Sequence, residues 1–198
     1  MNFLAHSYLS FDIPDLVVGN YLGDFVKNKH LKTLPQGIQQ GVKLHRFIDS
    51  YTDVHPLVKT GTRMLHASMA KYAPVAIDIY FDFLLAKHWA LFHESELPTF
   101  CEKIYDTLMA YDGPMPDYMI GRRRRMVAGR WLENYRTYAG LQKVFTFLSK
   151  RAKFPSNLDQ AGNILLTLEK PLEVEVFLPF FPILIDAVNT EISTYPSK

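Results

Sequence analysis

The chain has 198 residues, of which 48% are hydrophobic and 21% are charged, a balance that is ordinary for a single globular domain. Its formal net charge is only +2, which excludes a strong overall attraction to nucleic acid or to acidic surfaces. The single cysteine, Cys101, excludes an internal disulfide and fits a reducing cytoplasm.

Neither a secretion signal nor a membrane-spanning segment is expected. The N-terminus has no basic residue ahead of its short apolar run. The most apolar stretches, 73–92 and 174–188, both carry charged residues, and the second also contains Pro179 and Pro182. Both stretches are therefore predicted to be buried helices, and the protein is expected to be cytoplasmic and to have no membrane partner.

Apolar residues recur mainly at spacings of three and four, which predicts an all-α single domain over residues 1–198. Several prolines stand near the expected first turn of a helix, where the missing N–H costs no hydrogen bond. No internal repeat or linker divides the chain. The predicted helices cover residues 2–11, 14–28, 35–53, 56–71, 74–92, 96–111, 117–137, 140–152, 158–169 and 171–192.

The second and third predicted helices each carry two glycines four residues apart. In the second helix these are Gly19 and Gly23, and the third helix repeats the spacing just ahead of His45. Glycine inside a helix is less favourable than alanine by about 1 kcal/mol, so such pairs predict faces on which another backbone packs closely. A crossing of the two helices would bring Asp24 near His45. The alternative is that the glycines mark frayed turns.

The third predicted helix places His45, Asp49 and Asp53 four residues apart, so that their side chains share one face. An imidazole one turn from a carboxylate can bind a divalent cation or share a water that attacks phosphate. The alternative is a His–Asp pair at the edge of the core that has no chemical role.

The predicted helix 74–92 is largely apolar and nevertheless carries Asp78 and Asp82 one turn apart. A buried carboxylate must be paired, hydrogen-bonded or bound to metal, or its pKa rises until it is neutral. We expect Asp82 to reach a metal site and Asp78 to be structural support. A structural pairing of either carboxylate with Arg46 or Arg63 is the alternative.

Histidine and aspartate on apolar helices are therefore the candidate metal ligands of the N-terminal half. Mixed His and Asp ligation suits Mn, Mg, Fe or Zn, whereas the absence of paired cysteines argues against a structural zinc site. No motif for a serine or cysteine nucleophile is present. The candidates are His6, Asp24, His45, Asp49, Asp53, Asp78, Asp82 and His88.

Basic residues dominate the stretch between Met119 and Lys153, where ten Lys and Arg residues accompany a single acid, Glu133. An excess of this size predicts a docking surface for an anionic partner, which is either an acidic protein or a nucleic acid. No nucleic-acid-binding motif accompanies it. The alternative is a solvated helix face. The arginines singled out as substrate-binding are Arg122, Arg123, Arg124, Arg125 and Arg130.

Several short motifs, in order and over nearly the whole chain, resemble the bacterial acyl carrier protein phosphodiesterases. They are Met1-Asn-Phe-Leu-Ala-His6, Gly19-Asn20 through Gly23-Asp24-Phe25, His45-Arg46-x-Ile48-Asp49-x-x-Thr52-Asp53, the Asp78/Asp82/His88-Trp89 helix, Trp131-Leu-x-x-Tyr135-Arg136 and Phe181-Pro182. The resemblance implies an all-helical, divergent branch of the HD phosphohydrolases. It further implies a metal-dependent enzyme that releases 4′-phosphopantetheine from holo-acyl carrier protein, with Mn²⁺ preferred and Mg²⁺ or Fe²⁺ as alternatives.

The resemblance also implies a set of metal ligands. Asp24, His45 and Asp49 fall on the family's motif positions at the metal centre, and Asp82 is implied as a further ligand. The chain departs from the family at Phe83, where members often have histidine. This departure leaves the role of that position, and so the full ligand set, open.

Catalytic roles follow from the same resemblance and from the chemistry of phosphodiesters. Asp24 is expected to serve catalysis as well as the metal. A cation such as Arg46 would neutralise charge on the phosphate oxygens. His6 or His88 would protonate the leaving serine oxygen of the carrier protein, because imidazole titrates near neutral pH. The arginine run would hold acyl carrier protein, which is small, helical and acidic.

Two other functions compete with this interpretation. The first is a metal-dependent phosphohydrolase of nucleotides, which would not need basic residues outside its pocket. The second is a non-catalytic helical module that binds nucleic acid through the arginine run. In that second case the buried carboxylates would have no reason to converge, and the protein would bind no divalent cation.

Overall fold

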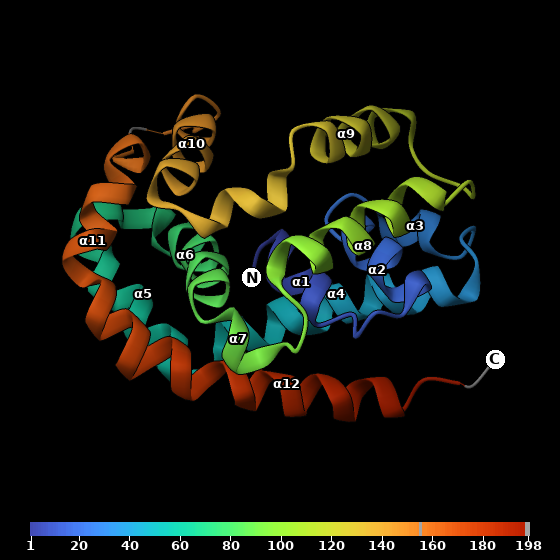
Figure 1. The fold of residues 1–198 in the computed structure, drawn as a ribbon, viewed down its shortest axis with the longest axis horizontal. Helices are drawn as coiled ribbons and strands as arrows, with labels where there is room; N and C mark the ends of the chain where they lie inside the picture. The colour runs from blue at the N-terminus through green and yellow to red at the C-terminus, as the bar shows by residue number, and fades with distance from the viewer. Residues whose placement is uncertain (155, 197–198) are drawn as a thin grey trace.

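The computed structural model describes residues 1–154 and 156–196, and these residues form helices and connecting turns with no strand (Figure 1). The all-α class is confirmed. The resemblance to the HD phosphohydrolase fold stays a prediction, as does the single-domain range 1–198, in which positions 155 and 197–198 lie outside the described residues. Within the described residues, none of the helices combines the length and the apolar composition that crossing a bilayer requires.

The first half of the chain wraps around its own N-terminus, which lies near the centre of the view (Figure 1). Prolines begin α2 and α5, as predicted. The helices of this half are α1 (Phe3–Tyr8), α2 (Pro14–Leu22), α3 (Asn28–Leu31), α4 (Gln36–Val54), α5 (Pro56–Met69), the 3₁₀ turn η1 (Ala70–Tyr72) and α6 (Ala73–Lys87).

The second half covers the first with a pair of helices at the top of the view and a long curved arm below (Figure 1). Its elements are α7 (Trp89–Phe92), α8 (Leu97–Ala110), α9 (Asp117–Ala128), the 3₁₀ segment η2 (Trp131–Arg136), α10 (Tyr138–Ser149), η3 (Leu158–Gln160), α11 (Ala161–Pro171), the π-helical η4 (Leu172–Phe177) and α12 (Leu178–Ser193). The π-helical turn η4 begins directly after Pro171.

The predicted helix 74–92 is divided at His88 into α6 and α7, and two further predicted helices are also divided. The predicted helix 14–28 ends at Leu22, and residues 23–27 form a turn before α3. The predicted helix 117–137 ends at Ala128, because Arg130 adopts a left-handed conformation with φ of 47° and the chain continues as η2. In both cases a loop-forming glycine lies at the division, Gly23 in the first and Gly129 in the second.

Helices α2 and α4 cross with their backbones in contact. A Cβ atom on Gly19 would lie 2.6 Å from the Cα atom of Gly41 and 2.4 Å from the carbonyl oxygen of Ile38. Distances this short do not occur between real Cβ atoms and a backbone, so only glycine fits at the crossing. The close crossing predicted from the glycine spacing is therefore confirmed. It sets the C-terminal end of α2 beside the middle of α4.

Helix α6 lies inside the bundle and packs against α1, α5, η2 and α10. Its residues from Ile79 to Leu85 are all buried. Because every side of this helix contacts another element, an acid on it must find a partner within the protein. The two acids of α6 find different partners, and this difference shapes the candidate site.

Candidate metal centre

Three donor side chains converge where α1 meets α4. One ring nitrogen each from His6 and His45 and one carboxylate oxygen of Asp49 lie within 4.8 Å of one another. His45 and Asp49 are one turn apart in α4, and His45 Nε2 lies 3.1 Å from Asp49 Oδ2. His6 Nε2 lies 3.1 Å from the other oxygen, Asp49 Oδ1. The Asp49 carboxylate therefore bridges the two imidazoles.

The two imidazoles lie against each other as a stacked pair. The ring centres of His6 and His45 are 4.1 Å apart, and the ring planes differ by 16°. Both residues are buried, and neither Nδ1 atom has a hydrogen-bond partner. All polar contacts of both rings are consequently made through Nε2, on the side that faces the carboxylates. We call His6, Asp24, His45 and Asp49 the cluster.

Asp24 joins the cluster from the turn that follows α2. Its Oδ1 atom lies 3.1 Å from His45 Nε2, while most of its side chain is exposed. The approach depends on Gly23, since a Cβ there would lie 2.1 Å from Cγ of His45. The imidazole thus packs directly on the backbone that ends α2. The predicted proximity of Asp24 and His45 is confirmed.

Arg46 holds the turn that carries Asp24. Its guanidinium donates to the carbonyl oxygen of Val26 at 2.6 Å and to Asn28 Oδ1 at 2.7 Å. Because Arg46 follows His45 in α4, this tie fixes the turn relative to the cluster. The guanidinium was expected to contact phosphate, but these hydrogen bonds give it a positioning role instead.

The pKa values of the two histidines in the cluster shift in opposite directions. Burial alone would lower the pKa of His45, but its hydrogen bonds to Asp24 and Asp49 outweigh this and raise the pKa to about 9. Burial, with the neighbouring imidazole, lowers the pKa of His6 to about 4. Burial disfavours the Asp49 carboxylate, yet hydrogen bonds from both imidazoles hold its pKa well below the usual range. The hydrogen bond from His45 likewise lowers the pKa of Asp24.

These groups fit a divalent cation. Two imidazoles and two carboxylates form a donor set that suits Mn, Fe or Zn. At neutral pH His6 is uncharged, and a cation would bind the lone pair of Nε2 in the tautomer that carries its proton on Nδ1. The proton on His45 is one that a cation can replace. With one imidazolium and two carboxylates, the cluster carries surplus negative charge. A bound cation would neutralise it.

The cluster opens into a small cavity of about 280 Å³, and a further acid stands on its wall. Asp78 lies there with Asp53, and its Oδ1 atom is 2.9 Å from the terminal ammonium of Met1. The same ammonium lies 3.5 Å from Asp49 Oδ1. Burial raises the pKa of Asp78, although the ammonium opposes this. Of the two acids on α6, Asp78 is therefore the one beside the cluster.

Comparison with known proteins decides the family. The family model described as acyl carrier protein phosphodiesterase matches residues 1–184. The chain belongs to the acyl carrier protein phosphodiesterase family.

Relatives that bear the name of this family cover most of the chain. A protein of Enterobacter sp. (strain 638) is 29% identical over 97% of this chain and 100% of its own length. One from Yersinia pestis is 30% identical over 92% of this chain and 94% of its own length. One from Escherichia coli O6:K15:H31 (strain 536 / UPEC) is 29% identical, covering 76% and 79%. No solved structure gives a significant match.

The family resemblance implied Asp82 as a further ligand, but its oxygens are engaged elsewhere. The fully buried carboxylate accepts hydrogen bonds at the start of α1, from the backbone N–H of Leu4 at 2.7 Å, of Ala5 at 3.1 Å and of Asn2 at 3.3 Å. Burial raises its pKa to about 7 although these hydrogen bonds favour the charged form. Asp82 thus anchors the helix that carries His6. The structural role expected of Asp78 therefore falls to Asp82, while Asp78 pairs with the terminal ammonium beside the cluster.

Two other family positions also lie away from the cluster. His88 follows the C-terminal end of α6, and its Nε2 atom lies 3.0 Å from Glu173 Oε1 in η4. Phe83, which stands where the family often has histidine, stacks on Tyr80 and contacts the ring of Tyr138 of α10 at a tilt. The departure at this position therefore does not remove a donor from the cluster.

Two arginines of the predicted docking surface, Arg123 and Arg130, make contacts within the protein. Arg123 donates to the carbonyl oxygens of Leu108 at 2.8 Å and Tyr111 at 2.6 Å, which ties α9 to the end of α8. Arg130 pairs with Glu102 at 2.9 Å and with the acid three residues further along the chain. Both guanidiniums therefore have structural contacts within the protein, and their place in a docking surface stays a prediction.

Arg122 faces the cluster from α9. Its guanidinium carbon lies 5.1 Å from the ring centre of Phe25, 5.3 Å from that of Phe3 and 5.4 Å from that of Trp131. Three aromatic faces therefore hold the cation beside the turn of Asp24. It shares a groove with that carboxylate. Sequence reasoning placed Arg122 in a docking run and missed this enclosed position.

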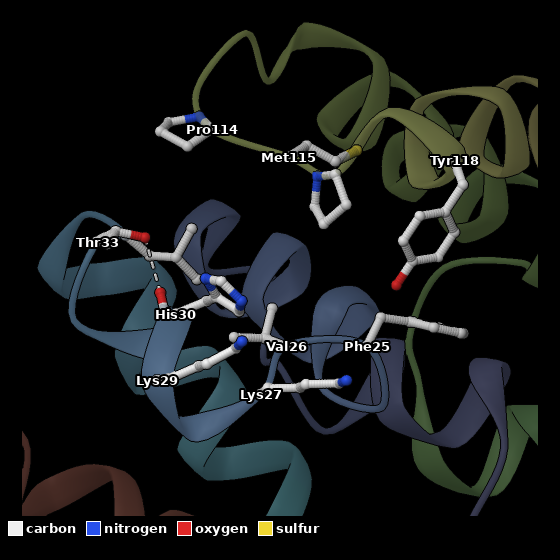
Figure 2. A pocket seen from close by; sticks show the side chains of 11 residues that line it. Phe25, Val26, Lys27, Lys29, His30, Thr33, Pro114, Met115 and Tyr118 are labelled. Atoms are coloured by element: carbon white, nitrogen blue, oxygen red, sulfur yellow. Dashed lines mark hydrogen bonds between the residues drawn. The ribbon is translucent and has the colours of Figure 1, made fainter.

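The remaining basic residues near the cluster are exposed. Arg124 and Arg125 lie on the outer face of α9, and Lys27 and Lys29 line a hollow of about 520 Å³ beyond Phe25. Figure 2 shows the two lysines on one wall of this hollow and residues of the segment leading into α9 on the opposite wall. The opposite wall is formed by Pro114, Met115, Pro116 and Tyr118.

Proposed function

We propose that the protein is a metal-dependent phosphodiesterase that removes 4′-phosphopantetheine from holo-acyl carrier protein and leaves the apo form. The observation that carries the proposal is the convergence of His6, His45, Asp49 and Asp24 in a member of this family. These four residues are proposed to hold the cation. Mn²⁺ is the first choice, with Mg²⁺ and Fe²⁺ as alternatives.

The residues of the cluster and the neighbouring Arg122 have different proposed roles in phosphodiester hydrolysis. A divalent cation held there supplies charge stabilisation at the phosphate and activates water at neutral pH. Asp49 positions both imidazoles, because each of its oxygens lies 3.1 Å from a different Nε2 atom. Arg122 offers a guanidinium beside Asp24, where it can bind phosphate oxygens in a bidentate manner.

The substrate carrier is proposed to dock on the exposed cations around the cluster. Acyl carrier protein is acidic, and Arg124, Arg125, Lys27 and Lys29 are the exposed basic residues on the elements beside Asp24. Because Arg123 and Arg130 are already bonded within the protein, the basic surface is a small patch and not a continuous stripe. A small patch favours an acidic protein partner over nucleic acid.

One assay tests the proposal directly. The purified protein is incubated with holo-carrier protein in Mn²⁺ or in EDTA, and the mass of the carrier is followed. We expect loss of the phosphopantetheine mass in Mn²⁺ only. His45→Ala should abolish turnover, whereas His66→Ala, which changes an exposed histidine of α5, should leave it unchanged. An unchanged carrier in Mn²⁺, together with cleavage of a nucleotide, would support the nucleotide phosphohydrolase instead.

A further inference from the structure

A groove of about 470 Å³ adjoins the cluster and runs along η2 and α10. It shares Asn2, Phe3, Asp24 and Leu148 with the cavity that surrounds the cluster. A molecule in the groove would therefore have one end beside the proposed cation. A space of this volume is typical of a site for a small or linear ligand, whereas a docked protein covers a broad surface of about 800 Å².

The end of the groove nearest the cluster is built for an anion. The guanidinium of Arg122 stands there between aromatic rings, forms no ion pair within the described residues, and has a buried Nε without a hydrogen-bond partner. Asp24 is the sole acid among the lining residues, and it belongs to the cluster. A phosphate group held between a cation at the cluster and Arg122 would balance the positive charge of both.

The rest of the groove suits a neutral chain. Val144, Phe147 and Leu148 of α10 supply apolar surface to the groove, as does Trp131 of η2. Phe147 is 49% exposed, although a large apolar side chain is usually covered. The side-chain amide of Asn134 also lines the groove and offers both a donor and an acceptor. Apolar walls with one amide match a ligand that carries methyl groups and amides.

Two further cations favour an anionic ligand over a purely neutral one. Lys143 and Arg151 line the same groove, and the guanidinium carbon of Arg151 lies 4.5 Å from the ring centre of Phe147. Three cations thus surround a space that contains a single carboxylate. The resulting positive potential concentrates anions at the groove.

We propose that this groove binds the 4′-phosphopantetheine arm, with its phosphate at Arg122 and its neutral chain along Trp131, Val144 and Phe147. The proposal rests on the proposed function, which supplies a substrate with such an arm. The arm has a phosphate at one end and continues as a neutral chain of methyl groups and amides that ends in a thiol. The arm thus combines a phosphate, for which Arg122 stands beside Asp24, with a neutral chain, for which α10 and Trp131 supply apolar surface.

Calorimetric titration of the released product tests the groove without turnover. 4′-Phosphopantetheine is titrated into the Mn²⁺-loaded protein, and apo-carrier protein is titrated separately. We expect Arg122→Gln to weaken product binding roughly tenfold or more, because a charge-assisted hydrogen bond is lost. Phe147→Ser should weaken it about threefold through lost apolar contact. Binding of apo-carrier protein should not change.

Matched variants separate the groove from general effects. Arg63→Gln and Phe154→Ser change an exposed arginine and an exposed phenylalanine outside the groove, and both should bind the product as the parent protein does. Val144→Trp should obstruct the groove and weaken binding even if truncation of Phe147 alters the helix. Thermal melting of each variant confirms that it is folded.

The outcomes distinguish the two proposals. Product binding that is unchanged in Arg122→Gln and Val144→Trp, in a protein that hydrolyses holo-carrier protein, would overturn the groove assignment alone. Loss of apo-carrier binding in these variants, with product binding intact, would make the groove a docking surface for the carrier and would also overturn it. Failure of the parent protein to hydrolyse holo-carrier protein would instead overturn the proposed function.

Discussion

The imidazole of His45 packs on the backbone of Gly23, and this contact allows it to reach the carboxylate of Asp24. A Cβ atom on Gly23 would lie 2.1 Å from Cγ and 2.4 Å from Cδ2 of the imidazole. Gly23 ends α2, and His45 lies in the middle of α4. Because Gly23 has no side chain, the imidazole of His45 can lie directly against the end of α2. The fold and the proposed chemistry therefore depend on the same residue.

Replacing Gly23 with alanine tests this dependence. The added methyl group would displace the imidazole, so Gly23→Ala should cost about 1–3 kcal/mol in free energy of unfolding and should abolish stabilisation by Mn²⁺. Chemical denaturation with and without Mn²⁺ measures both effects. Gly121→Ala in α9 is the control, because a Cβ there meets only Arg125 Nη1 at 3.4 Å. It should gain about 0.5–1 kcal/mol.

Removal of the cation should destabilise the protein by an amount set by its affinity. A ligand present at a hundred times its dissociation constant stabilises the folded state by about 2.7 kcal/mol, and EDTA should remove this contribution. Asp49→Asn loses one bridging oxygen and should lose the response to Mn²⁺, whereas the exposed-site variant Asp186→Asn should retain it. Equal responses of the two variants in thermal melts would remove Asp49 from the ligand set.

In the metal-free protein, the contributions of the two cluster histidines to stability should be lost on opposite sides of pH 6.5. The pKa of His45 is raised to about 9, so its ion pairs stabilise the folded state fully below pH 6.5 and are lost as the pH rises through 9. The difference corresponds to about 3 kcal/mol. The pKa of His6 is lowered to about 4, so its contribution is lost as the pH falls from 6.5 to 4. Asp82, whose pKa is raised to about 7, favours the folded state as the pH falls through the same range, so it opposes the loss from His6. Denaturation in EDTA between pH 4 and 9 measures both limbs.

Asp24→Asn separates these two limbs. Asp24 lies beside His45 and not beside His6, so the substitution should flatten the decline above pH 6.5 and leave the acid limb in place. An alkaline limb that is equally steep in Asp24→Asn would show that the His45–Asp24 pair does not contribute to stability.

The glycine spacing and the His45–Asp49 pair were predictable from the sequence because both are local. A residue and its neighbour four positions on share a helix face in any context, and glycine pairs in a helix interior need a packing reason. The crossing of α2 and α4, and with it the approach of Asp24, followed from these two rules. The turn after Gly23 did not, because Arg46 holds it from another helix.

The roles of Asp78 and Asp82 could not be separated by pattern. Both lie on the same apolar helix one turn apart, and each needs a partner. Their partners distinguish them. Three backbone N–H groups at the start of α1 donate hydrogen bonds to Asp82, whereas Asp78 pairs with the terminal ammonium of Met1. These contacts join segments about 80 residues apart in the chain, beyond any local periodicity. His6 was identified through its motif and not through its spacing for the same reason.

Asp82 is therefore predicted to matter for stability. Asp82→Asn would turn an amide NH₂ toward one of the N–H groups at the start of α1, so the free energy of unfolding should fall by about 2–3 kcal/mol. Turnover should also fall if the displaced helix moves His6. Asp78→Asn should cost less stability, because its side chain is partly exposed, while it changes the charge beside the cluster. The reverse order in thermal melts would restore the original expectation.

The exposed arginines of α9 are predicted to govern the encounter with the carrier protein. Arg124→Glu combined with Arg125→Glu should lower kcat/KM on holo-carrier protein at low salt by roughly tenfold, mainly through a slower encounter, and should make the rate less sensitive to added salt. Hydrolysis of a small generic phosphodiester should be nearly unchanged, because neither residue lines the cluster cavity or the groove. Arg123 is left intact, because its hydrogen bonds to α8 are structural.

The matched control for the double reversal lies on α5. Lys59→Glu combined with Arg63→Glu makes the same change of net charge on an exposed helix face that lies away from α9 (Figure 1). It should leave kcat/KM on the carrier close to that of the parent protein. If both double variants lose activity equally, the effect follows from net charge and not from a docking site. If neither loses activity, the carrier does not dock on α9, and Lys27 and Lys29 become the next candidates because they line the hollow beside Phe25.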